Sequence, residues 1–205
     1  MDLPFSLEPE GAPAVTYDLT GNDLTGNGLT GNGLTLSAQA HTDLFVDPAG
    51  GTPPRGAGRL VGLPPEGDFT LGTRVTVEFR ATYDAGALLL YADDRHFAKL
   101  CFEYSPQHRP TAVTVVTRGT SDDSNSFEVD GDTIWLRITR TGQAWAFHAS
   151  TDGTWWRLLR YFALDAPAPV KIGFLAQSPM GEGCTAVFTD ITYRAAAPDD
   201  LRDGS

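Results

Sequence analysis

Apolar and polar residues alternate along most of the chain after residue 70. An alternation with a period of two is typical of β-strands that bury one face. Turn-forming pairs such as Asp130-Gly131 and Asp152-Gly153 separate several of these runs, as they do in β-hairpins. No run shows the period and the capping residues of a helix. The pattern predicts strands at 72–81, 87–91, 97–104, 112–118, 133–140, 144–150, 155–162, 170–176 and 184–194.

Strands that follow one another through short turns pair in an antiparallel manner, and so many of them need two packed sheets. The sequence therefore predicts an all-β fold, a two-sheet antiparallel sandwich of the jelly-roll type, in a single domain over residues 1–205. A chain of this length buries enough apolar surface to fold without a disulfide framework or a metal.

The first 70 residues have a different character. Leucine recurs every fifth position over residues 18–36, at Leu19, Leu24, Leu29 and Leu34, within repeated Leu-Thr-Gly-Asn units. So few repeats cannot stack into a solenoid core. We expect a Gly/Asn-rich loop that leads into a strand at 34–40, then a Pro/Gly-rich loop at 47–65. The acidic residues 198–205 are expected to form a flexible tail.

Charge and composition exclude several functions. The net charge of −11 opposes nucleic-acid binding and association with anionic membranes, since both need clustered Lys and Arg. The N-terminus lacks the basic and apolar regions of a signal peptide, and no apolar run is long enough to span a membrane. Two cysteines, Cys101 and Cys184, are too few for a disulfide framework. We expect a cytoplasmic protein with free thiols.

Several segments, in order along nearly the whole chain, resemble one family. They include His41-Thr42-Asp43-Leu44-Phe45, Asp84-Ala85-Gly86-Ala87-Leu88, Phe97-Ala98-Lys99-Leu100-Cys101-Phe102-Glu103, Trp135-Leu136-Arg137, Ser150-Thr151-Asp152-Gly153 and Gln177-Ser178-Pro179. They are similar to the domain of unknown function 1349 family, in the concanavalin A-like superfamily, and especially to its branch named for regulation of enolase. The resemblance implies a jelly roll related to legume lectins and β-glucanases. It implies no established reaction, and kinship of fold alone does not transfer a function.

Strand alternation separates the two faces of each predicted strand. Lys99, Cys101 and Glu103 share one face of the strand at 97–104, opposite Ala98, Leu100 and Phe102. If the strands share the concave sheet on which lectins bind sugars, their polar residues converge in one groove. The candidate ligand-binding residues are Lys99, Glu103, Arg137, His148, Arg160 and Gln177, and Asp43, Asp84 and Asp122 are possible contributors from loops.

Each candidate also has a structural interpretation. Lys99 with Glu103 could be an ordinary surface ion pair, the arginines could be strand-face salt bridges, and His148 could be a satisfied structural group. The Asx-rich loop around Asp122 and Asp123 offers oxygen ligands for calcium, yet such residues form turns on their own. The sequence assigns no metal, cofactor or catalytic residue, because the paired carboxylates and metal-ligand spacings that would mark one are missing.

Three functions follow, in order of preference. The first is non-catalytic binding of a carbohydrate or small polar ligand on the concave sheet. The second is a cytosolic regulatory domain with a protein partner, as the enolase-regulator resemblance implies. The third is a glycan-acting hydrolase or lyase in which Glu103 serves as acid or base.

Overall fold

The computed structural model describes residues 3–11, 15–20, 33–52 and 54–205, and these residues form strands and loops without a helix. The described part of the chain accordingly offers no helical segment long and apolar enough to cross a membrane. The strands are β1 (Glu8–Glu10), β2 (Thr16–Thr20), β3 (Gly33–Ser37), β4 (Thr42–Asp43), β5 (Arg55–Gly56), β6 (Arg59–Gly62), β7 (Phe69–Glu78), β8 (Ala85–Asp93), β9 (His96–Tyr104), β10 (Pro110–Arg118), β11 (Thr120–Glu128), β12 (Thr133–Thr141), β13 (Ala144–Ser150), β14 (Arg157–Ala163), β15 (Lys171–Gln177) and β16 (Thr185–Arg194).

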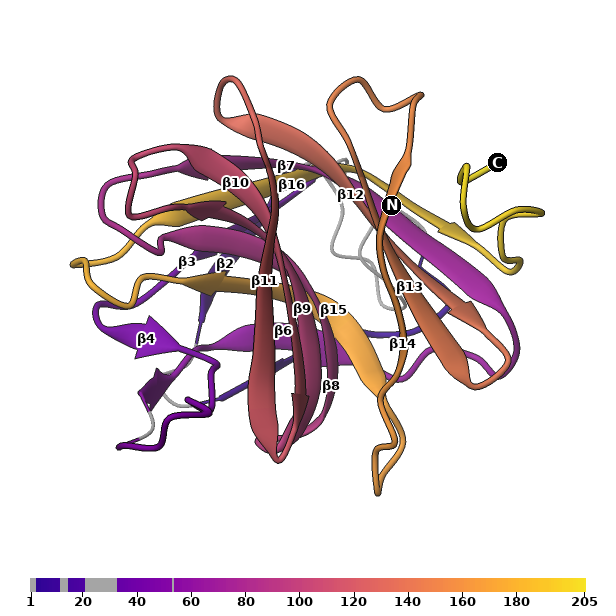
Figure 1. Ribbon diagram of the computed structural model, residues 1–205, viewed down its shortest axis with the longest axis horizontal. Coiled ribbons are helices and arrows are strands. Elements are labelled where there is room, and N and C mark those ends of the chain that lie inside the picture. The colour runs from indigo at the N-terminus through magenta and orange to yellow at the C-terminus, as the bar shows by residue number, and fades with distance from the viewer. Residues whose placement is uncertain (1–2, 12–14, 21–32, 53) are drawn as a thin grey trace.

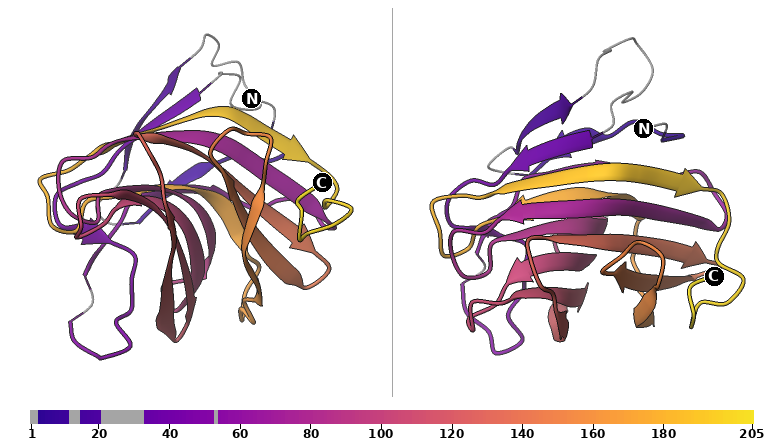
Figure 2. Two further views of the ribbon diagram at one scale, coloured as in Figure 1. Left: turned by 45° about the horizontal axis from the view of Figure 1, so that its top comes forward. Right: turned by 90° about the horizontal axis from the view of Figure 1, so that it is seen from above.

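Two seven-stranded antiparallel sheets make up most of the described structure, and β4 and β5 form a small parallel sheet beside them (Figure 1). Sheet A has the order β1-β6-β15-β8-β9-β10-β11, and sheet B has the order β14-β13-β12-β7-β16-β3-β2. Figure 2 shows the sheets stacked as two layers that curve in the same sense, with sheet A on the inside of the bend. The outer face of sheet A is therefore the concave face. The predicted antiparallel sandwich is confirmed.

The alternation seen in the sequence sorts side chains as expected. In β9, Leu100 and Phe102 are fully buried in the core between the sheets, together with Phe147 of β13 and Phe188 of β16. Burying each such side chain contributes about 1.5–3 kcal/mol. Cys101 points to the other side of sheet A, where a second apolar cluster lies. Both cysteines are buried free thiols, which confirms the expectation from their number.

The prediction that the Asx-rich segment around Asp122 is a loop is wrong, because this segment is strand β11. Its register with β10 runs from Arg118–Thr120 to Thr111–Glu128, with a bulge near Ala112. Strand β11 is the edge of sheet A, and most of its residues are exposed. Charged and hydroxyl side chains protect an exposed edge from pairing with another chain, so an edge strand can resemble a loop in sequence.

At the N-terminal side, β3 matches the strand expected at 34–40 and pairs with β2 and β16. Most of the five-residue repeat, residues 21–32, lies outside the described residues. Residues 198–205, which were expected to form a flexible tail, fold back on sheet B in the structure, and their flexibility stays a prediction. Their own turn is closed by hydrogen bonds from Asp199 N to Ser205 O, 2.7 Å, and from Gly204 N to Asp200 O, 2.9 Å.

Candidate functional site

A short segment, residues 42–46, crosses the concave face of sheet A. At one end the backbones of Thr42 and Ser178 exchange two hydrogen bonds of 3.2 Å. At the other end Val46 N donates to Ser121 Oγ, 2.9 Å, and Ser121 N donates to Val46 O, 2.8 Å. Between these anchors Leu44 covers the second apolar cluster, which includes Ala87, Leu89, Cys101 and Val113. This crossing segment divides the concave face into two regions.

Lys99 lies under the crossing segment and is 2% exposed. Its Nζ donates to Asp43 Oδ1, 3.0 Å, and to Gln177 Oε1, 2.8 Å. Burial alone lowers the pKa of Lys99, but the surrounding acidic groups, Asp43 foremost, outweigh burial and raise it. The buried cation is thus paired and hydrogen-bonded within the protein, so Lys99 and Gln177 fix Asp43 and the crossing segment to the sheet.

Glu103 occupies the region of the concave face beyond this network. Its neighbours across the sheet are Ala85 of β8 and Thr111 of β10. The side chain is partly buried. Its carboxyl oxygens make no hydrogen bond to the described residues, yet they are not among the buried atoms that lack a partner, so water reaches them. Burial raises the pKa of Glu103 to about 8, with a further increase from the carboxylates of Asp43 and Asp123 and an opposing effect of Lys99. At neutral pH this carboxyl group is mainly protonated, so it can both donate and accept a hydrogen bond.

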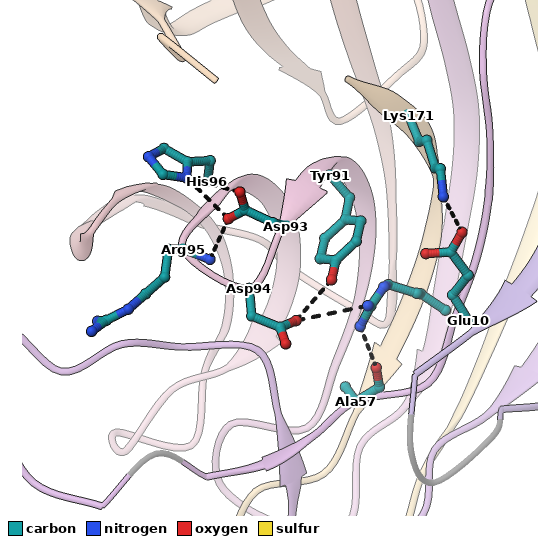
Figure 3. Close-up of polar contacts among 9 residues, drawn as sticks. Glu10, Ala57, Tyr91, Asp93, Asp94, Arg95, His96 and Lys171 are labelled. Carbon is teal, nitrogen blue, oxygen red and sulfur yellow. Dashed lines mark hydrogen bonds and ion pairs between the residues drawn. The ribbon is translucent and has the colours of Figure 1, made fainter. Parts of the chain in front are cut away.

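The opposite region of the concave face is bonded internally. Figure 3 shows Tyr91 Oη donating to Asp94 Oδ1, 2.8 Å, and Asp93 beside His96. Arg59, 6% exposed, stacks over the Tyr91 ring at 3.8 Å and donates to Ala57 O. Burial, followed by the bond to Asp94, raises the pKa of Tyr91 to about 12.

A pocket of about 730 Å³ opens at this end, between the loop at 43–56 and the β8–β9 turn, with Arg95 and Thr120 in its wall. Asp43 lines this pocket too, but Glu103 does not. The pocket and the Glu103 region are therefore two separate places on one face.

The expectation that all six candidate residues line one groove is wrong. Lys99, Glu103 and Gln177 share the concave face of sheet A, as their strand faces predict. Arg137 and His148 lie on the outer face of sheet B, because β12 and β13 belong to that sheet. The residues 198–205 cover them: Arg137 Nη2 donates to Gly204 O, 2.8 Å, and His148 Nε2 donates to Leu201 O, 2.7 Å.

The remaining candidates hold the fold together. Arg160 reaches from β14 to the edge of sheet A, where it pairs with Asp122 Oδ2 at 2.8 Å and donates to Thr114 O. Asp122 is therefore a bridge between the sheets. Among the described residues no group of three or more acidic, His or Cys side chains lies close enough together to hold a metal ion. Asp84 is fully buried and accepts hydrogen bonds from Arg80 N, Ala81 N and Ser178 Oγ, which orders the turn before β8.

Two residues near Glu103 were not assigned to the groove by the sequence interpretation, which considered Asp123 only as a calcium ligand in a loop. Asp123 of β11 faces the concave side opposite Val115, and its pKa is raised by partial burial. Tyr83, with an exposed side chain, stands in the turn before β8, and its carbonyl accepts a bond from Gln177 Nε2. Neighbouring residues of a strand face opposite sides of the sheet. Recognising β11 as a strand would therefore have placed Asp122 and Asp123 on different faces and made Asp123 a candidate for the concave side. No sequence signal marked Tyr83.

The sheet orders, the shared curvature and the polar residues on the inner bend define a jelly-roll sandwich of the concanavalin A-like class. The model of the family described as "Protein of unknown function (DUF1349)" matches residues 26–196, and the chain belongs to this family. The resemblance found in the sequence is thereby confirmed. No curated protein sequence matches the chain.

Solved structures extend the comparison. A functionally unknown protein from Saccharomyces cerevisiae has a TM-score of 0.73 at 22% identity, covering 88% of this chain and 96% of that one. The GH43 protein BlXynB from Bacillus licheniformis has a TM-score of 0.64 at 15% identity, covering 78% of this chain and 33% of that one. A xylan β-1,4-xylosidase from Bacillus halodurans C-125 has a TM-score of 0.64 at 12% identity, covering 78% and 32%. The chain spans about a third of these two glycoside hydrolases, and at such identities the similarity establishes the fold alone.

Proposed function

We propose that the protein binds a carbohydrate or another small polyhydroxylated ligand on the concave face of sheet A, around Glu103. The observation that carries this proposal is a carboxyl group on the concave face that is protonated at neutral pH, is open to water and is not bonded to another described residue. A ligand that binds there replaces the water with its own donor and acceptor groups. A sugar hydroxyl, itself both donor and acceptor, is a matched partner.

The surroundings of Glu103 support the same ligand class. Ala85, the neighbour of Glu103 across the pairing of β8 with β9, has a small side chain, so it does not screen the carboxyl group from the concave side. Tyr83, 39% exposed, offers an aromatic face at the same end of the sheet. Sugar sites combine such a ring with a few convergent polar groups. Because the structural neighbours include a xylan β-1,4-xylosidase, xylo-oligosaccharides are the first ligands to test.

A titration of the intact protein with xylo-oligosaccharides, followed by calorimetry and thermal unfolding, tests the proposal. Glu103→Gln and Tyr83→Ala should each weaken binding at least about tenfold, as expected when one good polar or stacking contact is lost. The matched control is Glu128→Gln, since Glu128 is an exposed carboxylate of neighbouring β11 that pairs with Arg109. Binding of a panel of neutral sugars that is unchanged in both Glu103→Gln and Tyr83→Ala would contradict the proposal.

A glycan-acting hydrolase or lyase is the second candidate, and one observation favours it. A protonated Glu103 stands near Asp43, a carboxylate that Lys99 holds in place, and enzymes use pairs of carboxyl groups whose environments differ in this way. The same samples should be analysed for shorter sugars after prolonged incubation. Products that form with the parent protein but not with Glu103→Gln would assign Glu103 as the acid.

A further inference from the structure

A second pocket, of about 470 Å³, lies on the outer face of sheet B, on the side of the sandwich opposite the Glu103 region. Its floor comes from β7, β12 and β16, and residues 204–205 close one side, at the yellow end of the chain in Figures 1 and 2. The lining residues include Arg137, Arg194, Trp135, Trp156, Thr192 and Gly72.

The arginines of this pocket have no carboxylate partner. Arg137 and Arg194 form no ion pair within the described residues, although the chain carries 26 acidic and only 15 basic side chains. Asp190 also lines the pocket, yet it does not pair with either arginine. Burial, with a smaller effect of Arg194, lowers the pKa of Arg137 to about 10. Two neighbouring cations in an acidic protein form a local site of positive potential.

The guanidinium group of Arg137 is oriented but only partly bonded. It stacks over the Trp156 ring at 4.2 Å, which fixes its plane. Its Nη2 donates to Gly204 O, while its Nε is buried and has no hydrogen-bond partner. These two nitrogens lie on one edge of the guanidinium group and donate in parallel. A single carbonyl oxygen satisfies one of them, whereas a group with two anionic oxygens satisfies both in the bidentate arrangement that Arg favours.

We propose that this pocket binds a small oxyanion, a carboxylate or a phosphate group, which displaces the Gly204 carbonyl from Arg137 and bonds to both Nε and Nη2. Arg194 adds a second positive charge to the pocket. The indole ring of Trp156 holds the guanidinium group of Arg137 in place for the ligand. Without a ligand, the carbonyl group of Gly204 occupies part of this anion site, and the ligand must displace it. This site is independent of the Glu103 region, because the two lie on different sheets.

Gly204 fits so closely against Arg137 that a substitution there should strengthen oxyanion binding, whereas loss of Arg137 should weaken it. Gly204 has a φ of +76°, and a Cβ added there would lie 2.5 Å from Arg137 Nη2 and 2.7 Å from Trp156 Cβ. Ala therefore cannot occupy this place without moving the backbone outward. Gly204→Ala should free the Arg137 edge while leaving the floor from β7, β12 and β16 intact, so it should bind an oxyanion more tightly than the parent protein does.

The test is a titration of the full chain with inorganic phosphate, with D-glucuronate and with neutral D-glucose, at constant ionic strength. The fluorescence of Trp135 and Trp156 in the pocket wall reports binding, and calorimetry gives the affinity. We expect phosphate or glucuronate, but not glucose, to change this fluorescence, and the tighter of the two identifies which oxyanion the pocket prefers. Arg137→Gln should weaken binding about tenfold or more, and Gly204→Ala should strengthen it severalfold.

The matched control is Arg157→Gln, because Arg157 also stacks on an aromatic ring, that of Phe127 at 4.5 Å, but lies outside the pocket. It should leave oxyanion binding unchanged. If Arg137→Gln does not fold, Arg194→Gln replaces it, since Arg194 is exposed. The proposal is overturned if neither anion binds the parent or Gly204→Ala, or if binding is the same in the Arg137→Gln or Arg194→Gln variant as in the parent.

Discussion

Replacing Glu103 with Gln removes a titrating group while keeping its size and most of its shape. In the folded protein the pKa of Glu103 is raised from 4.5 to about 8. Between these two values the native state holds a proton that the unfolded chain releases. The unfolded state then binds fewer protons, so the free energy of unfolding of the parent protein falls as the pH rises through this interval. The Gln side chain has no such dependence.

The size of the effect follows from the same interval. At about 1.4 kcal/mol per pH unit, the span from 4.5 to about 8 sets an upper limit of about 5 kcal/mol. Glu103 is only partly buried, so screening by water reduces this to roughly 2–4 kcal/mol. Relative to the parent, Glu103→Gln should therefore become more stable by that amount between pH 5 and pH 9.

Urea unfolding at several pH values measures this directly, because the free energies of the two proteins are compared at each pH. Asp43, Asp123 and Lys99 surround Glu103 and remain in both proteins, so their own titrations largely cancel in the comparison. Glu128→Gln, at an exposed carboxylate, serves as the control and should follow the parent at every pH. Parallel stability profiles for the parent and Glu103→Gln would refute the assignment of a raised pKa to this residue.

Three further outcomes are expected. Arg160→Gln removes the link from β14 to Asp122 and Thr114 and should cost about 1–3 kcal/mol in urea unfolding, whereas a change below about 0.5 kcal/mol would show that the sheets do not depend on it. Burial lowers the pKa of His148 to about 4, so the unfolded state gains a proton first as the pH falls below about 6.5. The stability of the protein should therefore decline between pH 6.5 and pH 4. Thermal unfolding of His148→Gln should show that this part of the decline is lost. Burial raises the pKa of Cys184 to about 12 and also raises that of Cys101. A thiol reagent should therefore detect neither cysteine in the native protein and both after denaturation. Rapid labelling of the native protein would contradict their burial.

Within a strand, the sequence alone determined which side chains share a face. The alternation in β9 separated Lys99, Cys101 and Glu103 from Leu100 and Phe102, and the structure has the same division. A period of two is a property of local backbone geometry, so it can be determined without knowledge of the partner strands. The class of fold and the hairpin at Asp152-Gly153, between β13 and β14, were predictable for the same reason. The hairpin expected at Asp130-Gly131 is wrong, because this turn joins β11 of sheet A to β12 of sheet B.

Only the tertiary structure decided which strands share a sheet. Glu103 and His148 both point away from the central core, yet they belong to opposite outer faces because β9 and β13 lie in different layers. Strand β11 was hidden as well, since the polar side chains that protect an edge strand are also those that form turns. The placement of the crossing segment over Lys99, and of residue 204 against Arg137, depends on contacts between positions far apart in the chain. Such contacts follow from how the two layers and their loops pack together, which no local pattern of residues encodes.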